Sequence, residues 1–134
     1  IRVENKVGVE IIGGTIIGDR NTHLGTTGEW GHGIEIKGCE DVKISGAKIQ
    51  DCWGDGIYVS ESAPNPSARL NIDKVYLHNN RRNNMSLVSF QDVTLSNSFF
   101  FNANGVDPEF GLDVEPNNTE FEGRRLNINN LVTP

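Results

Sequence analysis

The sequence contains little of what defines several large protein classes. Its 134 residues include two cysteines, one methionine and two tryptophans, and no apolar run approaches the roughly 18 to 20 residues that cross a bilayer. We therefore expect no membrane association. Residues 1–5 lack the charged and then apolar layout of a secretion signal. Strong helix formers do not occur in runs, whereas 15 glycines and many asparagines favour turns and short strands, so the sequence predicts one all-β domain.

The small numbers of basic residues and cysteines argue against a nucleic-acid partner, a disulfide scaffold and a zinc site. The 12 Lys and Arg residues are outnumbered by 18 Asp and Glu residues, and the net charge is −6. A nucleic-acid partner is not expected, because such binders usually present a clustered basic face. Cys39 and Cys52 are too few for a disulfide scaffold and have no second Cys or His pair for zinc. We predict two buried thiols, with one disulfide as the alternative.

The sequence also lacks the familiar motifs of nucleophilic and phosphate chemistry. It contains no Gly-x-Ser-x-Gly elbow and no Gly-rich phosphate loop that leads from a strand into a helix. His23 and His78 have no partner pattern for nucleophilic catalysis. Functional residues therefore have to be sought in the organisation of the chain.

An internal repeat is the main positive signal. The pattern apolar, any, apolar, four of any kind, apolar occurs at Val9, Ile11, Ile16; Val42, Ile44, Ile49; Leu70, Ile72, Leu77; and Val93, Leu95, Phe100. A fifth copy begins at Leu126 and Ile128. A second signature with two alternating apolar residues follows each complete copy, at 33–36, 56–59, 84–87 and 111–114. Successive copies begin 33, 28, 23 and 33 residues apart, which is typical of a solenoid.

Each copy is interpreted as one coil of a solenoid. Short strands with period 2 have one buried face and cannot bury it alone, so neighbouring coils must stack as parallel strands about 4.8 Å apart. A β-sandwich is the alternative, but it needs hairpins, and Asp55-Gly56 leads straight into a repeat strand. The insertions at 19–29, 61–68 and 104–110 are expected to form the walls of a groove. Because Ile1 is not an initiator Met, we expect residues 1–134 to be one domain of a longer chain.

Alignment of the copies on the second signature places outward residues in columns, one coil apart. The four columns are Trp30, Trp53, Arg81 and Pro108; His32, Asp55, Asn83 and Phe110; Glu35, Tyr58, Ser86 and Asp113; and Lys37, Ser60, Val88 and Glu115. Flat indoles suit sugar rings, and a guanidinium suits carboxylate or phosphate. The alternative for the two tryptophans is that they cap the open ends of the apolar interior.

Asp113 and Glu115 form the best candidate acid and base pair. Two residues apart on one strand, they share a face with Cα atoms roughly 6.5 Å apart, which allows the carboxyl separations of both retaining and inverting glycosidases. Arg81 and Arg82 lie one coil earlier and Asp55 two coils earlier. An anionic sugar can therefore meet a guanidinium while its glycosidic oxygen meets a carboxyl group.

The acidic residues of this region also allow two other interpretations. Structural ion pairs between Arg81 or Arg82 and Asp107, Glu109 or Asp113 would use the same residues. Asp107, Glu109, Asp113 and Glu115 can also supply the oxygen ligands that Ca²⁺ prefers, although no dedicated loop motif is present. Apart from this alternative, no cofactor is expected.

Three segments resemble a known family. Gly-Asp-Gly-Ile-Tyr-Val at 54–59, Asn-Asn-Arg-Arg-Asn-Asn-Met-Ser-Leu-Val at 79–88 and Gly-Leu-Asp-Val-Glu-Pro-Asn at 111–117 resemble the repeats of the pectin-lyase-like superfamily. The resemblance implies a single-stranded, right-handed parallel β-helix of four to five coils. The superfamily includes pectate lyases, polygalacturonases, mannuronan epimerases and the tailspikes and appendages of bacteriophages, most of which bind a long carbohydrate along one face.

The resemblance is greatest to tailspike and appendage depolymerases, and it implies a function. We expect the domain to bind and cleave an anionic cell-surface polysaccharide or teichoic-acid-like glycan, as a glycoside hydrolase or a lyase. The expected catalytic residues are Asp113, Glu115, Asp55 and Arg82, and the expected binding residues are Trp30, His32, Glu35, Trp53, Tyr58 and Arg81. In an elimination, Arg82 would be the base.

The same resemblance has consequences for location and assembly. It implies a virion or a cell-surface or secreted location, and a homotrimer, because tailspikes are commonly trimeric. The rival function is a non-catalytic module, either a glycan-binding adhesin or a structural shaft, because fold alone does not determine activity.

Overall fold

The computed structural model describes residues 1–116 and 123–133, which form thirteen strands and no helix. The strands are β1 (Arg2–Glu4), β2 (Val7–Ile12), β3 (Thr15–Ile17), β4 (Ile34–Lys37), β5 (Glu40–Ser45), β6 (Lys48–Gln50), β7 (Ile57–Ser60), β8 (Ser67–Asp73), β9 (Tyr76–His78), β10 (Met85–Leu87), β11 (Phe90–Phe101), β12 (Leu112–Val114) and β13 (Arg124–Val132). Asn117, which ends the third repeat motif, lies outside the described residues. Within these ranges no helix long and apolar enough to cross a membrane is found.

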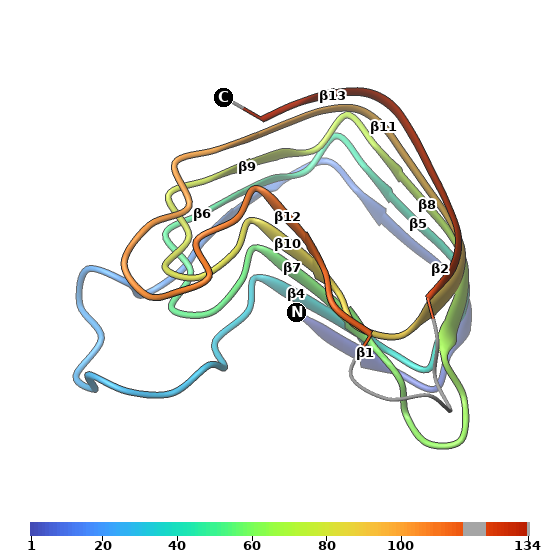
Figure 1. Cartoon of the computed structure of the whole chain (residues 1–134), viewed down its shortest axis with the longest axis horizontal. Coiled ribbons are helices and arrows are strands. Elements are labelled where there is room, and N and C mark those ends of the chain that lie inside the picture. Colours follow the sequence, from blue (N-terminus) through green and yellow to red (C-terminus); the bar gives the residue numbers. More distant parts are fainter. Residues whose placement is uncertain (117–122, 134) are drawn as a thin grey trace.

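The strands form two sheets in which all the strand pairs are parallel. The first sheet has the order β1-β4-β7-β10-β12, and the second has the order β2-β5-β8-β11-β9-β6-β3, with β13 paired to β11. Neighbouring strands come from successive coils, which lie on one another from the first coil to the last (Figure 1). The chain is therefore a right-handed parallel β-helix, as predicted.

The second sheet bends, so that each coil has three sides. Strand β11 pairs with β8 through its first half and with β9 through its second half. Between the two halves lies Asn97, whose φ of 49° is in the left-handed region that Asn tolerates better than most residues. Its amide donates to Asp73 Oδ1 at 2.8 Å and its Oδ1 accepts from Asn130 Nδ2 at 3.1 Å, so the corner is tied to the coils on both sides.

The repeat positions form ladders that fill the interior. Val9, Val42, Leu70, Val93 and Leu126 pair in register, as do Ile11, Ile44, Ile72, Leu95 and Ile128, and Ile16, Ile49, Leu77 and Phe100. The members of these ladders in the middle coils are buried. Cys39 and Cys52 join this core as free thiols, which confirms the first of the two alternatives. Burial raises the pKa of Cys52 to about 12, so its thiol stays protonated.

An outward column on the second sheet alternates in charge. Asp41, Arg69, Asp92 and Arg125 are opposite one another in successive coils, and all have positive φ. Arg69 Nε donates to Asp41 Oδ1 at 2.7 Å, and Arg125 pairs in the same way with Asp92. Hydrogen bonds from the two arginines lower the pKa of both carboxyl groups. We call these four residues the charge ladder.

The charge ladder predicts a specific acid sensitivity. A carboxyl group whose pKa is lowered by folding stabilises the fold above its unfolded pKa, and this contribution is lost as the pH falls through the folded value. We expect Arg69→Met to reduce the thermal midpoint at pH 7 slightly, because the ladder is exposed, and to make its decline below about pH 5 shallower. Circular dichroism melts between pH 7 and pH 2.5 measure both effects.

Lys43→Met, which removes an exposed cation on β5, is the matched control and should follow the wild-type pH profile. Identical acid profiles for Arg69→Met and the wild type would contradict a stabilising role of the ladder.

Candidate active site

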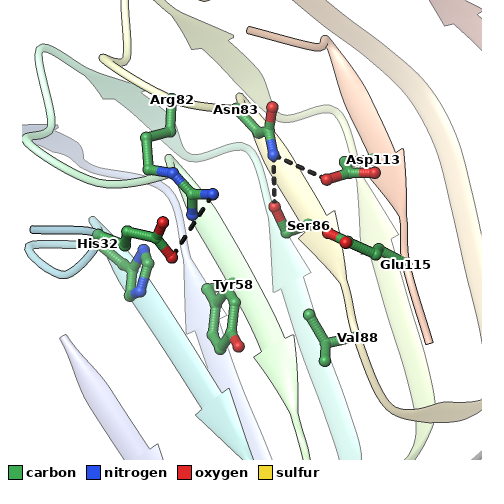
Figure 2. Close-up of a pocket in the computed structure, with 9 residues that line it drawn as sticks. His32, Tyr58, Arg82, Asn83, Ser86, Val88, Asp113 and Glu115 are labelled. Carbon is green, nitrogen blue, oxygen red and sulfur yellow. Dashed lines mark hydrogen bonds and ion pairs between the residues drawn. The ribbon is translucent and has the colours of Figure 1, made fainter. Parts of the chain in front are cut away.

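A groove crosses the outward face of the first sheet at its last three strands. Its deeper part, of about 290 Å³, is lined by Glu29, His32, Tyr58, Arg82, Asn83, Ser86, Val88, Asp113 and Glu115 (Figure 2). An adjoining hollow of about 470 Å³ shares Arg82, Asp113 and Glu115 and adds Asp107, Pro108, Phe110 and Val114. Because the two hollows share three residues, they form one continuous groove. The insertions at 19–29 and 104–110 contribute to its walls, as predicted, whereas the insertion at 61–68 lines neither hollow.

The strand register explains why the deeper part is hollow. Glu35, Tyr58, Ser86 and Asp113 pair in sequence across β4, β7, β10 and β12, which confirms the third predicted column. Side chains in such a column are about 4.8 Å apart. The small Ser86 lies between the larger Tyr58 and Asp113, so a depression opens over β10 with an aromatic ring on one side and a carboxyl group on the other.

Tyr58 and His32 make the aromatic side of the groove. Their rings stack with centroids 4.5 Å apart and planes 7° apart. His32 Nδ1 accepts the backbone N–H of Asp55 at 3.0 Å, and burial lowers the pKa of His32 to about 4. The imidazole is therefore neutral at neutral pH, and its approach to the Asp55 carboxyl, 3.7 Å, is not an ion pair. Burial also raises the pKa of Tyr58.

Asp55 lies beneath the groove and not on its surface. Its side chain is completely buried, whereas the column alignment grouped it with outward residues. Oδ1 accepts the backbone N–H of Asn83 at 3.0 Å, and Oδ2 accepts the hydroxyl of Ser86 at 2.9 Å. Burial raises the pKa of Asp55, and these hydrogen bonds act in the opposite direction. Asp55 thus positions Asn83 and Ser86 and does not face a bound glycan.

Asn83 connects the buried carboxyl group to the predicted acid and base pair. Its Oδ1 accepts the backbone N–H of Phe110 at 2.8 Å, which fixes the orientation of the amide. Its Nδ2 then donates to Ser86 Oγ at 3.1 Å and to Asp113 Oδ2 at 3.0 Å (Figure 2). In the predicted columns Asn83 lies next to Asp55, without an expected catalytic or binding role.

Arg82 is the cation of the groove. Its Nη2 is 3.7 Å from Glu29 Oε2 and its Nη1 is 3.9 Å from Asp55 Oδ1, both beyond ordinary hydrogen-bond length. Its buried Nε has no hydrogen-bond partner among the described residues. The ion pairs of Arg82 in the described part of the chain thus differ from the predicted structural pairs with Asp107, Glu109 or Asp113. The N–H groups at Nη1 and Nη2 of Arg82 can therefore donate hydrogen bonds to an acceptor on a bound ligand.

Arg81 and Trp53 are placed away from the groove. Arg81 is 6 % exposed, and its Nη1 donates to the carbonyl oxygens of Gly28, at 2.9 Å, and Trp53, at 3.3 Å. Its Cζ is 3.8 Å from the Trp53 ring, which is 8 % exposed and also stacks on His23 at 4.0 Å. These contacts hold the loop of residues 18–33 against the coils. They leave neither side chain an open face for a sugar, contrary to the expectation for this column.

Trp30 and Glu35 lie beside the groove without lining it. Trp30 is 68 % exposed and directly follows Glu29, so it remains accessible next to the groove wall. Glu35 lies one strand beyond Tyr58, and its Oε2 is 3.7 Å from Arg2 Nε. The predicted roles of both residues in glycan binding remain predictions.

Residues 1–116 and 123–133 contain no group of three or more His, Cys, Asp or Glu side chains that could together hold a metal ion. Glu109 is engaged with the backbone, because its Oε1 accepts the N–H of Gly105 at 2.5 Å. Binding of Ca²⁺ by the acidic residues of this region remains a prediction.

The class of protein follows from the fold, the groove and a family comparison. The chain matches the model of the family described as right handed beta helix region over residues 3–132, and it belongs to that family. Two relatives from Bacillus subtilis (strain 168) match 80 % of the chain: the uncharacterized protein YclG, 37 % identical over 122 residues, and the SPbeta prophage-derived uncharacterized protein YorA, 32 % identical over 124 residues. The chain spans 21 % of the length of each relative.

Solved structures with the same coil arrangement include two proteins connected with carbohydrates. A proposed glycosyl hydrolase from Parabacteroides merdae ATCC 43184 matches with a TM-score of 0.55 and 26 % identity, over 75 % of this chain and 40 % of that protein. The tailspike protein gp49 of Acinetobacter baumannii bacteriophage Fri1, a capsular polysaccharide depolymerase, matches with a TM-score of 0.67 and 19 % identity, over 92 % of this chain and 23 % of the tailspike. At that identity the tailspike likeness shows the fold alone.

Proposed function

We propose that this domain binds an anionic cell-surface polysaccharide along the groove and cleaves it as a glycoside hydrolase. The observation that carries the proposal is the groove itself, where Asp113 and Glu115 line the same hollow as Arg82, whose Nη atoms have no carboxylate closer than 3.7 Å within the described ranges. The likeness to a proposed glycosyl hydrolase and to a capsular polysaccharide depolymerase supports a carbohydrate substrate.

The two carboxyl groups have different surroundings, which suit different roles. Asn83 holds the half-buried carboxyl of Asp113, which then acts as the base that takes a proton from water, or as the nucleophile. Glu115 is exposed just after β12 and donates its proton to the glycosidic oxygen. As the bond from the anomeric carbon to that oxygen breaks, the water or carboxylate oxygen bonds to the anomeric carbon.

Arg82 fits an anionic group of the substrate. Because its donors lack short partners in the free protein, a carboxylate or phosphate gains charge-assisted hydrogen bonds there without displacing strong ones. The same residue supports the second candidate reaction, elimination at a uronic acid. In that reaction Arg82, in its deprotonated form, removes the proton from the carbon next to the carboxylate. The glycosidic C–O bond on the neighbouring carbon breaks, its oxygen leaves with a proton from Glu115, and the product carries a new C=C bond, which its ultraviolet absorption reveals.

We also propose a location on a virion or a cell surface. The prophage-derived relative and the tailspike likeness support it. The tailspike resemblance also leads us to propose a homotrimer. Light scattering of the full chain, which measures the mass of the assembly, tests this proposal.

Size-exclusion chromatography of candidate polymers tests the proposed function. Bacterial capsular polysaccharides, teichoic acids and pectin are incubated with the full chain that carries this domain, and their lengths are compared before and after. We expect one polymer to become shorter. If none is shortened while one co-elutes with the protein, the domain is a non-catalytic binding module.

A further inference from the structure

Negative charge predominates along the groove. Four carboxyl groups line it, those of Glu29, Asp107, Asp113 and Glu115, and Arg82 is its one cationic residue in the described part of the chain. His32 adds no charge at neutral pH, because burial lowers its pKa to about 4. The buried Asp55 lies directly beneath Ser86 and within 3.9 Å of the guanidinium. A bound polymer therefore meets one positive position surrounded by negative ones.

The spacing of these charges limits the charge that a substrate can carry. Successive strands are about 4.8 Å apart, so neighbouring groove positions lie well within the Debye length of about 8 Å at physiological ionic strength. A second anionic group on the next sugar would face Asp113, Glu115 or Glu29 with little screening. Like charges at such distances disfavour binding.

The geometry points to a substrate with sparse charge: a heteropolysaccharide in which one anionic sugar per repeating unit binds at Arg82 and the neighbouring sugars are neutral. Polyuronates, in which every sugar is anionic, are rejected. This inference rests on the proposed function and specifies its substrate class. The neutral sugars occupy the Tyr58 and His32 side of the groove and the space beside Asp113 and Glu115.

Glu29 is the residue that sets this selectivity. It comes from the loop between β3 and β4, its side chain is 74 % exposed, and its carboxylate is 3.7 Å from Arg82 Nη2. A substrate anion therefore competes with Glu29 for the guanidinium. Replacing Glu29 by Gln removes one repelling charge and the competitor while preserving the size of the side chain.

The test compares three polymers by affinity electrophoresis and by the shortening assay. They are the heteropolysaccharide that the wild type shortens or retains, the same polymer with its carboxyl groups reduced to alcohols, and polygalacturonate. We expect the wild type to prefer the unmodified heteropolysaccharide to both others. Glu29→Gln should raise the affinity for polygalacturonate about three- to tenfold and leave that for the reduced polymer unchanged. Salt at 0.5 M should diminish this gain.

Glu10→Gln, which removes an exposed carboxylate on β2 in the other sheet, is the matched control and should change none of these affinities. Efficient shortening of polygalacturonate by the wild type, or an unchanged profile for Glu29→Gln, would overturn the selectivity inference and leave the proposed function standing. Failure of every polymer to be shortened or retained would overturn the proposed function itself. Retention of the heteropolysaccharide in preference to polygalacturonate, without shortening of either, would support the selectivity and refute only the cleavage.

Discussion

Asp113→Asn is expected to lower the turnover of the polysaccharide by about 10²- to 10⁴-fold and to change its affinity much less. The amide has nearly the same size as the carboxyl group and its oxygen can still accept the hydrogen bond of Asn83, so the groove keeps its shape. It cannot, however, accept a proton from water or act as a nucleophile. The expected loss of about 10²- to 10⁴-fold is the contribution that one general acid or base typically makes to the rate.

Turnover is measured from the growth of reducing ends, and affinity by electrophoresis in gels that contain the polymer. Glu10→Gln provides the control for loss of one negative charge far from the groove. Wild-type turnover in Asp113→Asn would mean that this carboxylate takes no part in the cleavage and that other groups of the groove perform it.

Asp55→Ala is expected to reduce the free energy of unfolding by about 3 to 5 kcal/mol, the typical loss when one partner of a buried charged network is removed. The substitution leaves the backbone N–H of Asn83 and the hydroxyl of Ser86 without their acceptor, and Arg82 without its buried carboxylate partner. Urea unfolding followed by circular dichroism measures the change. Asp55→Asn, which keeps one acceptor oxygen, should lose less.

The exposed Glu10→Ala should stay within about 0.5 kcal/mol of the wild type. A similarly small loss in Asp55→Ala would show that the network beneath the groove adds little to stability.

The pH dependence of stability offers an independent check on the role of Asp55. Because burial raises the pKa of Asp55, its contribution to stability decreases as the pH rises from about 3.8 through its folded value, opposite to Asp41 and Asp92.

The strands of this protein could be predicted from sequence because two periodicities reinforce each other. Alternation with period 2 identifies the buried face of each strand, and the repeat of the whole coil sets which residues pair. The column from Glu35 to Asp113 therefore has the predicted register, and Tyr58, Ser86 and Asp113 share the groove. No knowledge of the loops was needed for this part.

The turns were harder to predict, because exposure there depends on the path of the insertions. The loop of residues 18–33 is held over Trp53 and Arg81, since Arg81 donates to the carbonyl oxygens of Thr26, at 3.4 Å, and Gly28. Alignment of the copies could not reveal this, because the loop has no counterpart in the other coils. Glu29 falls within an insertion that was predicted to form a groove wall, but the alignment could not show that its carboxylate approaches Arg82.

Because the register of the first sheet is constant, positions along the groove are separated by whole strand spacings. Each additional coil would lengthen it by one strand spacing of about 4.8 Å and leave the side chains on either side in their own surroundings. The coil that begins at Leu70 has no insertion and the shortest repeat, 23 residues to Val93. Duplicating this coil would move Asp113 one further strand spacing away from Tyr58. In this architecture, the length of the bound polymer segment can change without a change in the residues that carry out the reaction.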